Sequence, residues 1–383
     1  RAAIALAQQG DYEQSLALLA ELRRAAPDDP SLLYDETTVL AWAQQDAAVL
    51  ANADTINPAA APGYVVRAVA KSARNLGRYE QAAEWYRALL TRAPDDRDAA
   101  AGYAMTRAEA GGEAEARASL NSALADSPDD TQLRFASAYL DERVGAWSAA
   151  IGEYDNVLGR EPGSSIALRG KALALRELRL PGEALAIARA HPGTLSDVEV
   201  RNLEVDELSI ALEEASLAPG GSAARTRAIE PLLAEIDRQL EDEPLTSPIA
   251  RRLRYDRIVG LVEVYRPEPA AADYLALLDE KAAIPAYVHD AAGRAFLQLR
   301  EPEQSLAAFD RAATLAPDDA DIEMERFYAY SDLEQYDDAL TLADGLVERF
   351  DDPFDGATLA AGVGSLHHDQ HSGPELGIVE QTT

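Results

Sequence analysis

The chain has 383 residues, of which 35 are basic and 67 acidic, so its formal net charge at pH 7 is −32. This charge disfavours nucleic acids and anionic membrane surfaces as partners and attracts cationic ones, although acidic helix faces that only keep a large protein soluble explain it equally well. The chain has no cysteine, which excludes thiolate catalysis, cysteine-bound zinc and disulfide bonds.

Hydrophobic residues make up 47% of the chain, enough for a continuous core, and many of them are alanine, the best helix former. No apolar run reaches the roughly 18 residues that a membrane-spanning helix needs. The chain begins at Arg1 without a methionine or a charged-then-apolar leader, so we interpret it as a mature or excised part of a longer product. The lack of cysteine suits an envelope compartment without proving it.

The first two units of the chain repeat a pattern of two helices and a turn. Gly10 is followed 17 residues later by Pro27, where the second helix of the first unit ends. The second unit is degraded, with helices predicted at 31–43 and 47–56 around a turn at 44–46. Gly10 and Gly77 are 67 residues apart, one residue fewer than two periods of 34. We therefore infer a one-residue deletion between them.

Three clear units follow. In each, glycine recurs after 34 residues and a proline follows 17 later: Gly77 with Pro94, Gly111 with Pro128, and Gly145 with Pro162. Gly111 tolerates the left-handed conformation that closes a helix, and Ala116 is small where two helices cross closely. Pro128 ends the second helix, and the aspartates after it favour the next helix start. This period is typical of the tetratricopeptide repeat, which buries its apolar stripe only against neighbouring units.

The period continues through residues 165–191, where Arg179 takes the place of the turn glycine, and is then lost. Ser196 and Glu199 form a capping box that opens a helix to about Ser216, and a further helix is predicted over about 224–240. We interpret this stretch as an insertion or a strongly diverged unit.

Periodicity returns in three late units, at 252–283, 286–317 and 320–351. Counting by 34 places their turns at Arg266, Arg300 and Glu334. The sequence therefore predicts an all-α fold, a right-handed α-solenoid of about nine helical hairpins. Its predicted domains are N-terminal tetratricopeptide repeats at 1–193, a diverged helical segment at 194–251, C-terminal repeats at 252–351, and a disordered tail at 352–383.

The tail has no apolar stripe, which predicts disorder. His367, His368 and His371 have a spacing that would let two of them meet a metal ion on one helix face, but adventitious binding is the better interpretation in such a segment. The sequence has no nucleophile–base motif, no Gly-rich phosphate loop and no paired-carboxylate site on a defined scaffold. We therefore predict no enzymatic activity, no cofactor and no metal site.

Several passages outside the repeat signature resemble one family. They are LAWAQQDAAVL at 40–50, PGYVVRAVAKSARNLGRYEQA at 62–82, LALRELRLPGEALAIARAHPG at 173–193, RLRYDRIVGL at 252–261, and IPAYVHDAAGRAFLQLREPEQSLAAF at 284–309. They are similar to the outer-membrane export porins for poly-β-1,6-N-acetyl-D-glucosamine (the PgaA type), in which a periplasmic repeat solenoid precedes a C-terminal β-barrel. Strands of about 10 alternating residues are absent after Phe350, so any membrane association is expected only through a barrel that this chain lacks.

The resemblance implies a periplasmic scaffold at the outer membrane that serves biofilm matrix secretion. Its implied partners are partly deacetylated poly-N-acetylglucosamine and the periplasmic polysaccharide deacetylase that delivers this polymer. An alternative of another class is a general scaffold for protein–protein interactions that binds a peptide or a partner helix. A more remote alternative is the solenoid of a related cellulose or alginate export system.

Solenoids of this type bind on the concave face, which the first helix of each unit lines. Inward template positions combine aromatic rings with carboxylates, a composition that suits a sugar polymer with free ammonium groups, because rings cover apolar sugar faces and carboxylates pair with amines. The alternative is that inward tyrosines only pack the helix layer. The polymer-binding candidates are Tyr64, Asp98, Glu109, Phe135, Tyr139, Glu142, Asp290, Tyr328 and Asp332.

A basic stripe lies on the first helix of the third unit. Arg67, Lys71 and Arg74 are spaced i, i+4 and i+7, which places three cations on one helical face. They are candidates for docking an acidic segment of a protein partner. The simpler interpretation is that they only balance nearby acidic residues.

Overall fold

The computed structural model describes residues 1–349, which form twenty α-helices and no strand. The tail predicted to be disordered, with His367, His368 and His371, lies outside the described residues. The described chain divides into two compact units, Arg1–Leu203 and a second that begins at Glu204. The division falls inside a helix of the diverged segment, and the assignment of residues 194–251 to a domain of their own stays a prediction.

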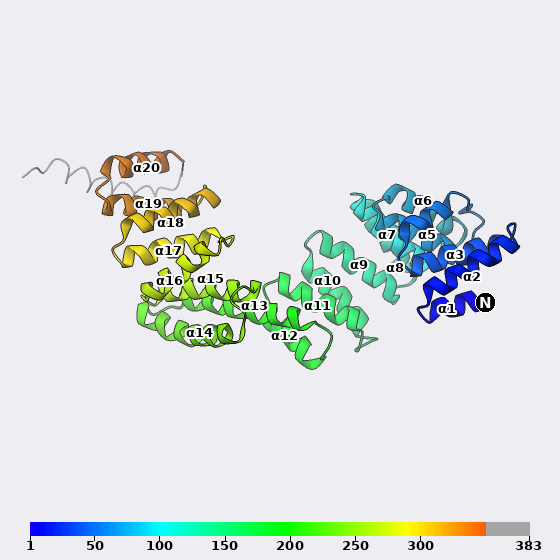
Figure 1. The fold of residues 1–383 in the computed structure, drawn as a ribbon, viewed down its shortest axis with the longest axis horizontal. Helices are drawn as coiled ribbons and strands as arrows, with labels where there is room; N and C mark the ends of the chain where they lie inside the picture. Colours follow the sequence, from blue (N-terminus) through cyan, green and yellow to red (C-terminus); the bar gives the residue numbers. More distant parts are fainter. Residues whose placement is uncertain (350–383) are drawn as a thin grey trace, which may run out of the picture. The chain divides into compact units, whose positions relative to one another are not determined.

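The helices are drawn in chain order in Figure 1. Those that begin in the first unit are α1 (Ala2–Gln8), α2 (Tyr12–Ala25), α3 (Pro30–Trp42), α4 (Asp46–Ala53), α5 (Gly63–Asn75), α6 (Tyr79–Arg92), α7 (Arg97–Glu109), α8 (Glu113–Asp126), α9 (Thr131–Arg143), α10 (Trp147–Leu158), α11 (Ser165–Glu177), α12 (Pro181–Ala190) and α13 (Asp197–Ser216). The others are α14 (Ser222–Asp242), α15 (Pro248–Glu263), α16 (Pro267–Asp279), α17 (Ala286–Gln298), α18 (Pro302–Leu315), α19 (Ala320–Asp332) and α20 (Tyr336–Arg349).

Successive helices pair into antiparallel hairpins, and first helices of neighbouring hairpins also touch. In the first unit α3 contacts α5, α5 contacts α7, and α7 contacts α9. In the second, α15 contacts α17, and α17 contacts α19. This arrangement is an α-solenoid of tetratricopeptide type, as predicted. Residues 1–349 contain the predicted nine hairpins, with the longer α13 and α14 between them.

The turn inside each regular hairpin needs one residue in the left-handed region. Glycine supplies it at Gly10, Gly77, Gly111 and Gly145, with φ between 70° and 91°. In the other hairpins a residue other than glycine adopts the left-handed conformation, with φ between 56° and 62°, at Gln44, Arg179, Tyr265, Arg300 and Glu334.

The turn predicted at Arg266 is wrong by one residue. Tyr265 has the positive φ of 57°, whereas Arg266 has a φ of −114° and precedes the first residue of α16. The connection after α16 contains an additional left-handed residue, Lys281, with φ of 53°. Counting back from Arg300 by a strict period of 34 therefore lands one residue late.

Aspartate caps four of the first helices, which explains why those helices begin where they do. Asp96 accepts a hydrogen bond from the backbone N–H of Ala99, and Asp130 accepts one from that of Leu133, both at 3.0 Å. Asp29 and Asp319 cap α3 and α19 in the same way. Each capping aspartate is the last residue of a Pro-Asp-Asp sequence, so one motif ends a hairpin and starts the next.

Close crossings inside the hairpins require small residues, as predicted for Ala116, which is fully buried. Where serine occupies the crossing, its hydroxyl donates to a carbonyl of the first helix. Ser15 Oγ lies 2.7 Å from Ala3 O, and Ser305 Oγ lies 2.9 Å from Gly293 O. The buried hydroxyls are thus satisfied without separating the helices.

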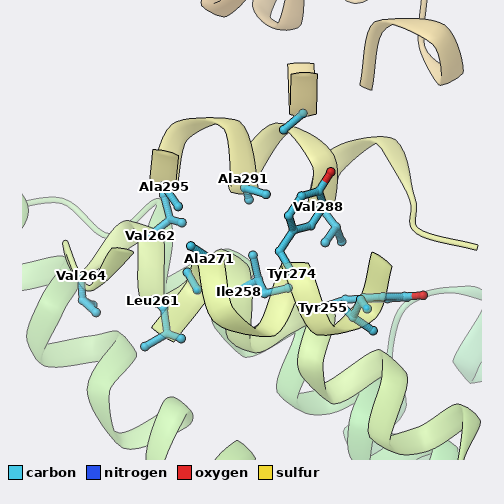
Figure 2. Packing of buried hydrophobic residues seen from close by; sticks show 14 of the residues in the cluster. Tyr255, Ile258, Leu261, Val262, Val264, Ala271, Tyr274, Val288, Ala291 and Ala295 are labelled. Carbon is cyan, nitrogen blue, oxygen red and sulfur yellow. The ribbon is translucent and has the colours of Figure 1, made fainter. Parts of the chain in front are cut away.

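The largest core cluster of the second unit lies among α15, α16 and α17, where the Tyr274 side chain of α16 extends toward α17 and lies beside Val288 (Figure 2). His289 belongs to this core. Its Nδ1 lies 2.7 Å from the Tyr274 hydroxyl, and burial lowers its pKa to about 4, so the ring is neutral at pH 7. This histidine is structural. None of the described helices combines the length and apolarity that crossing a membrane would require.

The diverged segment begins with the predicted capping box. Ser196 N–H donates to Glu199 Oε2 at 2.8 Å, and Glu199 N–H donates back to Ser196 Oγ at 3.3 Å. The backbone bond from Ser196 holds the pKa of Glu199 below its usual range. The box opens α13, which ends at Ser216 as predicted.

Candidate functional site

A cavity of about 450 Å³ opens on the first helices of the first three hairpins. We call it the α3–α5 pocket, since most of its lining comes from those helices, which contact one another. Its lining residues are Ile4, Asp35, Thr38, Ala41, Trp42, Tyr64, Arg67, Ala68 and Lys71.

Two aromatic rings line the α3–α5 pocket without being buried in the core. Trp42, the last residue of α3, is 43% exposed, and Tyr64, the second residue of α5, is 45% exposed. Partial burial raises the pKa of the Tyr64 phenol, which therefore stays protonated at neutral pH and can donate a hydrogen bond. Half-exposed rings with one polar edge suit the apolar face of a sugar.

The charges in this pocket are unequally engaged. Arg67 pairs with Asp96 and lies 3.9 Å from Asp98, both contributed by the next hairpin. In the described part of the chain, no salt bridge forms at Asp35 or at the exposed Lys71. Partial burial raises the pKa of Asp35, so this carboxylate gains from a cationic partner. Asp35 and Lys71 are thus the charges available to a ligand.

Three of the predicted residues join neighbouring repeats to each other. Arg74 Nε on α5 lies 3.5 Å from Glu109 Oε2 on α7, and the Tyr139 hydroxyl on α9 donates to Glu109 Oε1 at 2.7 Å. The guanidinium of Arg143 lies over the Tyr139 ring, 5.9 Å from its centroid. We call Arg74, Glu109 and Tyr139 the inter-repeat ladder. Because these three side chains already bind one another, the main role of the inter-repeat ladder is to hold α5, α7 and α9 together.

Two other candidates also have partners within the fold. Glu142 accepts a hydrogen bond at 2.7 Å from the Tyr154 hydroxyl, which belongs to the second helix of the same hairpin. Phe135 is partly buried, and its ring centroid lies 6.4 Å from that of Tyr154. Asp98 is different, since its side chain is 60% exposed and its one salt bridge to a described residue is the long contact of 3.9 Å with Arg67.

The candidates in the second unit are dispersed over α17 and α19. Asp290 pairs with Arg294 at 3.1 Å, and burial raises the pKa of its carboxyl group. Tyr328 is 46% exposed and meets the Phe327 ring edge to face. Asp332 lies 3.9 Å from Arg300, a long contact between two exposed groups. No described group of three or more acidic or histidine residues is placed to hold a metal ion.

Sequence reasoning found Tyr64, Arg67 and Lys71 but missed Trp42 and Asp35. The inward template positions of the unit of Gly77 have counterparts in the degraded unit before it. Counted from a turn at Gln44, which has a φ of 56°, the same five positions fall on Ser31, Tyr34, Thr38, Ala41 and Trp42, and the last three of these line the pocket. Asp35 lies outside those positions, and only the three-dimensional structure identifies it.

The comparison with known sequence families agrees with this architecture. The sequence profile of the tetratricopeptide repeat matches residues 68–131 and 135–196. The chain carries tetratricopeptide repeats. Among solved structures it is similar to a tetratricopeptide repeat protein from Parabacteroides merdae ATCC 43184, with 17% identity over 69% of this chain and 97% of that one and a TM-score of 0.38. It is also similar to the P58(IPK) TPR domain, with 14% identity over 87% of this chain and 96% of that one and a TM-score of 0.33.

Curated relatives extend the similarity beyond the matched repeats. The poly-beta-1,6-N-acetyl-D-glucosamine export proteins of Escherichia coli strain K12 and of Escherichia coli O157:H7 are each 23% identical over 342 residues. The match covers 88% of this chain and 41% of each relative. The chain therefore spans about two fifths of the length of the relatives it matches.

Proposed function

We propose that this chain is the polymer-receiving scaffold of an exopolysaccharide export system at the outer membrane. In the periplasm it would guide partly deacetylated poly-N-acetylglucosamine and dock the deacetylase that delivers it, for secretion of biofilm matrix. The similarity to the two export proteins supports this assignment. The observation that carries it is the α3–α5 pocket, which combines two half-exposed rings with an available carboxylate.

The chemistry of such a polymer fits this combination. A glucosamine unit presents an apolar ring face to Trp42 or Tyr64 and an ammonium group to Asp35, whereas an acetylated unit lacks the ammonium. The net charge of −32 adds long-range attraction for a polycation, which salt weakens. The remaining predicted carboxylates stay in the proposal as weaker contacts, and the Asp98 side chain, at 60%, is more exposed than that of Asp332, at 45%.

Isothermal titration calorimetry tests the proposal directly. Partly deacetylated β-1,6-linked glucosamine oligomers should bind at low salt, more weakly at moderate salt, and fully acetylated oligomers should not bind. Asp35→Asn should weaken binding at least tenfold at its site. The matched control is Glu84→Gln, which removes an exposed carboxylate of α6 outside the cavity and should leave binding unchanged. Equal binding of acetylated and deacetylated oligomers would reject the assignment.

A second candidate function rests on Lys71. This exposed cation lines the α3–α5 pocket and forms no salt bridge to another described residue, so it is available to a carboxylate of a protein partner. Arg67 and Arg74 are less available than predicted, because Asp96 and Glu109 engage them. Docking of an acidic peptide should therefore respond to Lys71→Ala more than to Arg74→Ala. Loss of polymer binding in Lys71→Ala would argue against this division of roles.

A further inference from the structure

The second unit has a cavity of about 500 Å³ on α13, α15 and α17, and the last two are first helices of their hairpins. We call it the α13–α17 pocket. Its lining residues all belong to the second unit: Ser209, Leu212, Glu213, Ser216, Arg252, Asp256, Val259 and Tyr287.

A buried carboxylate lies at this cavity. Asp256 is 9% exposed and accepts a hydrogen bond of 2.5 Å on Oδ2 from the Ser209 hydroxyl. Among the described residues this is the one hydrogen bond that the carboxylate receives. A buried carboxylate with so little compensation is costly, so a cationic group that enters the cavity gains a strong partner.

The neighbouring charges favour a cation over an anion. Arg252, the one basic residue of the lining, forms an ion pair with Asp206. Glu213 adds a second carboxylate to the lining, so acidic groups outnumber basic ones. An incoming phosphate or carboxylate would meet both acids and would have to compete with Asp206 for Arg252.

The remaining lining is suited to a sugar ring. Tyr287 is 51% exposed, and Leu212 and Val259 supply apolar surface beside it. Burial of the phenol raises the pKa of Tyr287 to about 12, so its hydroxyl stays protonated and can donate to a sugar oxygen. The hydroxyls of Ser209 and Ser216 already donate to Asp256 and to the Glu213 carbonyl, so their oxygens can only accept hydrogen bonds from a sugar.

We propose that the α13–α17 pocket is a second site for a hexosamine unit with a free ammonium group, and that it binds independently of the α3–α5 pocket. This inference rests on the proposed function, whose polymer supplies such units. Asp256 receives the ammonium, and the Tyr287 ring with its apolar neighbours covers one face of the sugar. A polymer offers the same unit many times, so two sites on one chain strengthen its retention by avidity.

The site has a pH signature. Burial raises the pKa of Asp256 to about 6, with Asp206 adding to this rise and Ser209 and Arg252 opposing it. Glu213 and Tyr287 are the other titratable groups that line the cavity. Because the ammonium needs the charged carboxylate, affinity at this site should fall below about pH 6, and Asp256→Asn should remove this dependence together with the binding.

Calorimetry with a fully deacetylated β-1,6-linked glucosamine trimer at pH 7.5 tests the inference. The native protein should bind two trimers. Asp256→Asn should abolish one site or weaken it at least tenfold, Asp35→Asn should do the same to the other, and each variant should keep the remaining site. The control Glu268→Gln removes an exposed carboxylate of α16 outside the cavity and should keep both sites. Thermal unfolding of each variant shows that it is folded.

The outcomes separate the two claims. A single site that Asp35→Asn removes and Asp256→Asn leaves intact would overturn the second site and keep the proposed function. A single site that responds only to Asp256→Asn would support the α13–α17 pocket and reject the α3–α5 pocket. A tri-lysine peptide that binds as tightly as the trimer and is lost in Asp256→Asn would overturn the assignment to a sugar. No binding of any probe would overturn both claims.

Discussion

The regular repeats and the irregular ones use their first helices differently. In the regular stretch, Arg74, Glu109 and Tyr139 lie about one period apart and satisfy one another across three hairpins. The α3–α5 pocket lies beside the one-residue deletion, and the α13–α17 pocket lies beside the long helix of the diverged segment. In the regular stretch Arg74, Glu109 and Tyr139 are structural contacts, although Asp98 stays largely exposed there. Beside the irregular stretches, Asp35 and Asp256 remain available to a ligand.

The largest expected effect concerns packing in the regular stretch. A Cβ atom added at Gly102 on α7 would lie 2.4 Å from the ring of the buried Tyr86 on α6. Gly102→Ala should therefore lower the free energy of unfolding by about 3 kcal/mol, the upper range for an overpacked core. Chemical denaturation measures this.

The matched control for Gly102 is Gly152 on α10, where an added Cβ meets nothing within 4 Å. Gly152→Ala should raise the unfolding free energy by about 0.5–1 kcal/mol, because alanine is the better helix former. If the two alanine variants were equally stable, the close approach of neighbouring hairpins would not be a constraint on the regular stretch.

A somewhat smaller effect is expected at Asp256. Its pKa is raised from 3.8 to about 6, so between these values the folded protein binds more protons than the unfolded chain. The contribution of Asp256 to the free energy of unfolding therefore falls as the pH rises through this range. One pKa unit corresponds to about 1.4 kcal/mol of unfolding free energy. Because partial solvation reduces the full effect of the shift, Asp256→Asn should raise the free energy of unfolding by about 2 kcal/mol at pH 7. At pH 4 the gain should be near zero.

His289 acts in the opposite direction in the same unit. Its pKa is lowered from 6.5 to about 4, so the unfolded chain binds more protons between these values and stability falls as the pH drops through this range. Asp256→Asn should therefore make the acid destabilisation of the second unit steeper, as measured by denaturation at several pH values. A variant that gained nothing at pH 7 would show that the buried carboxylate is already compensated, which weakens the case for a ligand there.

Disruption of the inter-repeat ladder should have a moderate effect. Glu109→Ala leaves Arg74 and the Tyr139 hydroxyl without their partner and should lower stability by about 1.5 kcal/mol, typical for a charged hydrogen bond. Asp98→Ala, whose side chain is exposed, should change stability by less than about 0.5 kcal/mol. A folded Glu109→Ala protein should keep most of its polymer binding, because Glu109 is at most a weak contact, and complete loss of binding would contradict its mainly structural role.

The smallest effect tests the turns. Glu334 has a φ of 58°, a conformation that glycine adopts more easily, so Glu334→Gly should stabilise the late repeats by about 0.5–1 kcal/mol. Gly145 occupies the same turn position in the regular stretch with a φ of 70°, and Gly145→Ala should destabilise by a similar amount. Thermal unfolding of both variants measures the difference. A shift of the same sign in both would contradict the account.

Much of this fold follows from local sequence, because the 34-residue period, the Pro-Asp-Asp caps and the small crossing residues each act within one hairpin. The prediction failed at Arg266, where an additional loop residue shifted the period. The pocket residue Trp42 could have been found by restarting the count at Gln44. Asp35 could not have been found in this way, because its position in the cavity depends on how three hairpins pack against one another.

The sequence also could not predict whether an inward residue has a partner within the fold or remains available to a ligand. Template positions identify Glu109 and Asp98 as equivalent candidates, yet the structure engages Glu109 with two partners and leaves Asp98 largely exposed. The difference depends on which side chains of the next hairpin come within reach. A single sequence does not specify these distances, whereas the stacked helices do.

The most direct test of the account is the fluorescence of Trp42 during titration with deacetylated β-1,6-linked glucosamine oligomers. The signal of this residue is the difference between the native protein and Trp42→Phe, which keeps Trp85 and Trp147. We predict a saturable change that weakens with salt and is absent with acetylated oligomers. Binding detected by calorimetry without any change at Trp42 would show that the polymer is received elsewhere, and would contradict the assignment of the α3–α5 pocket.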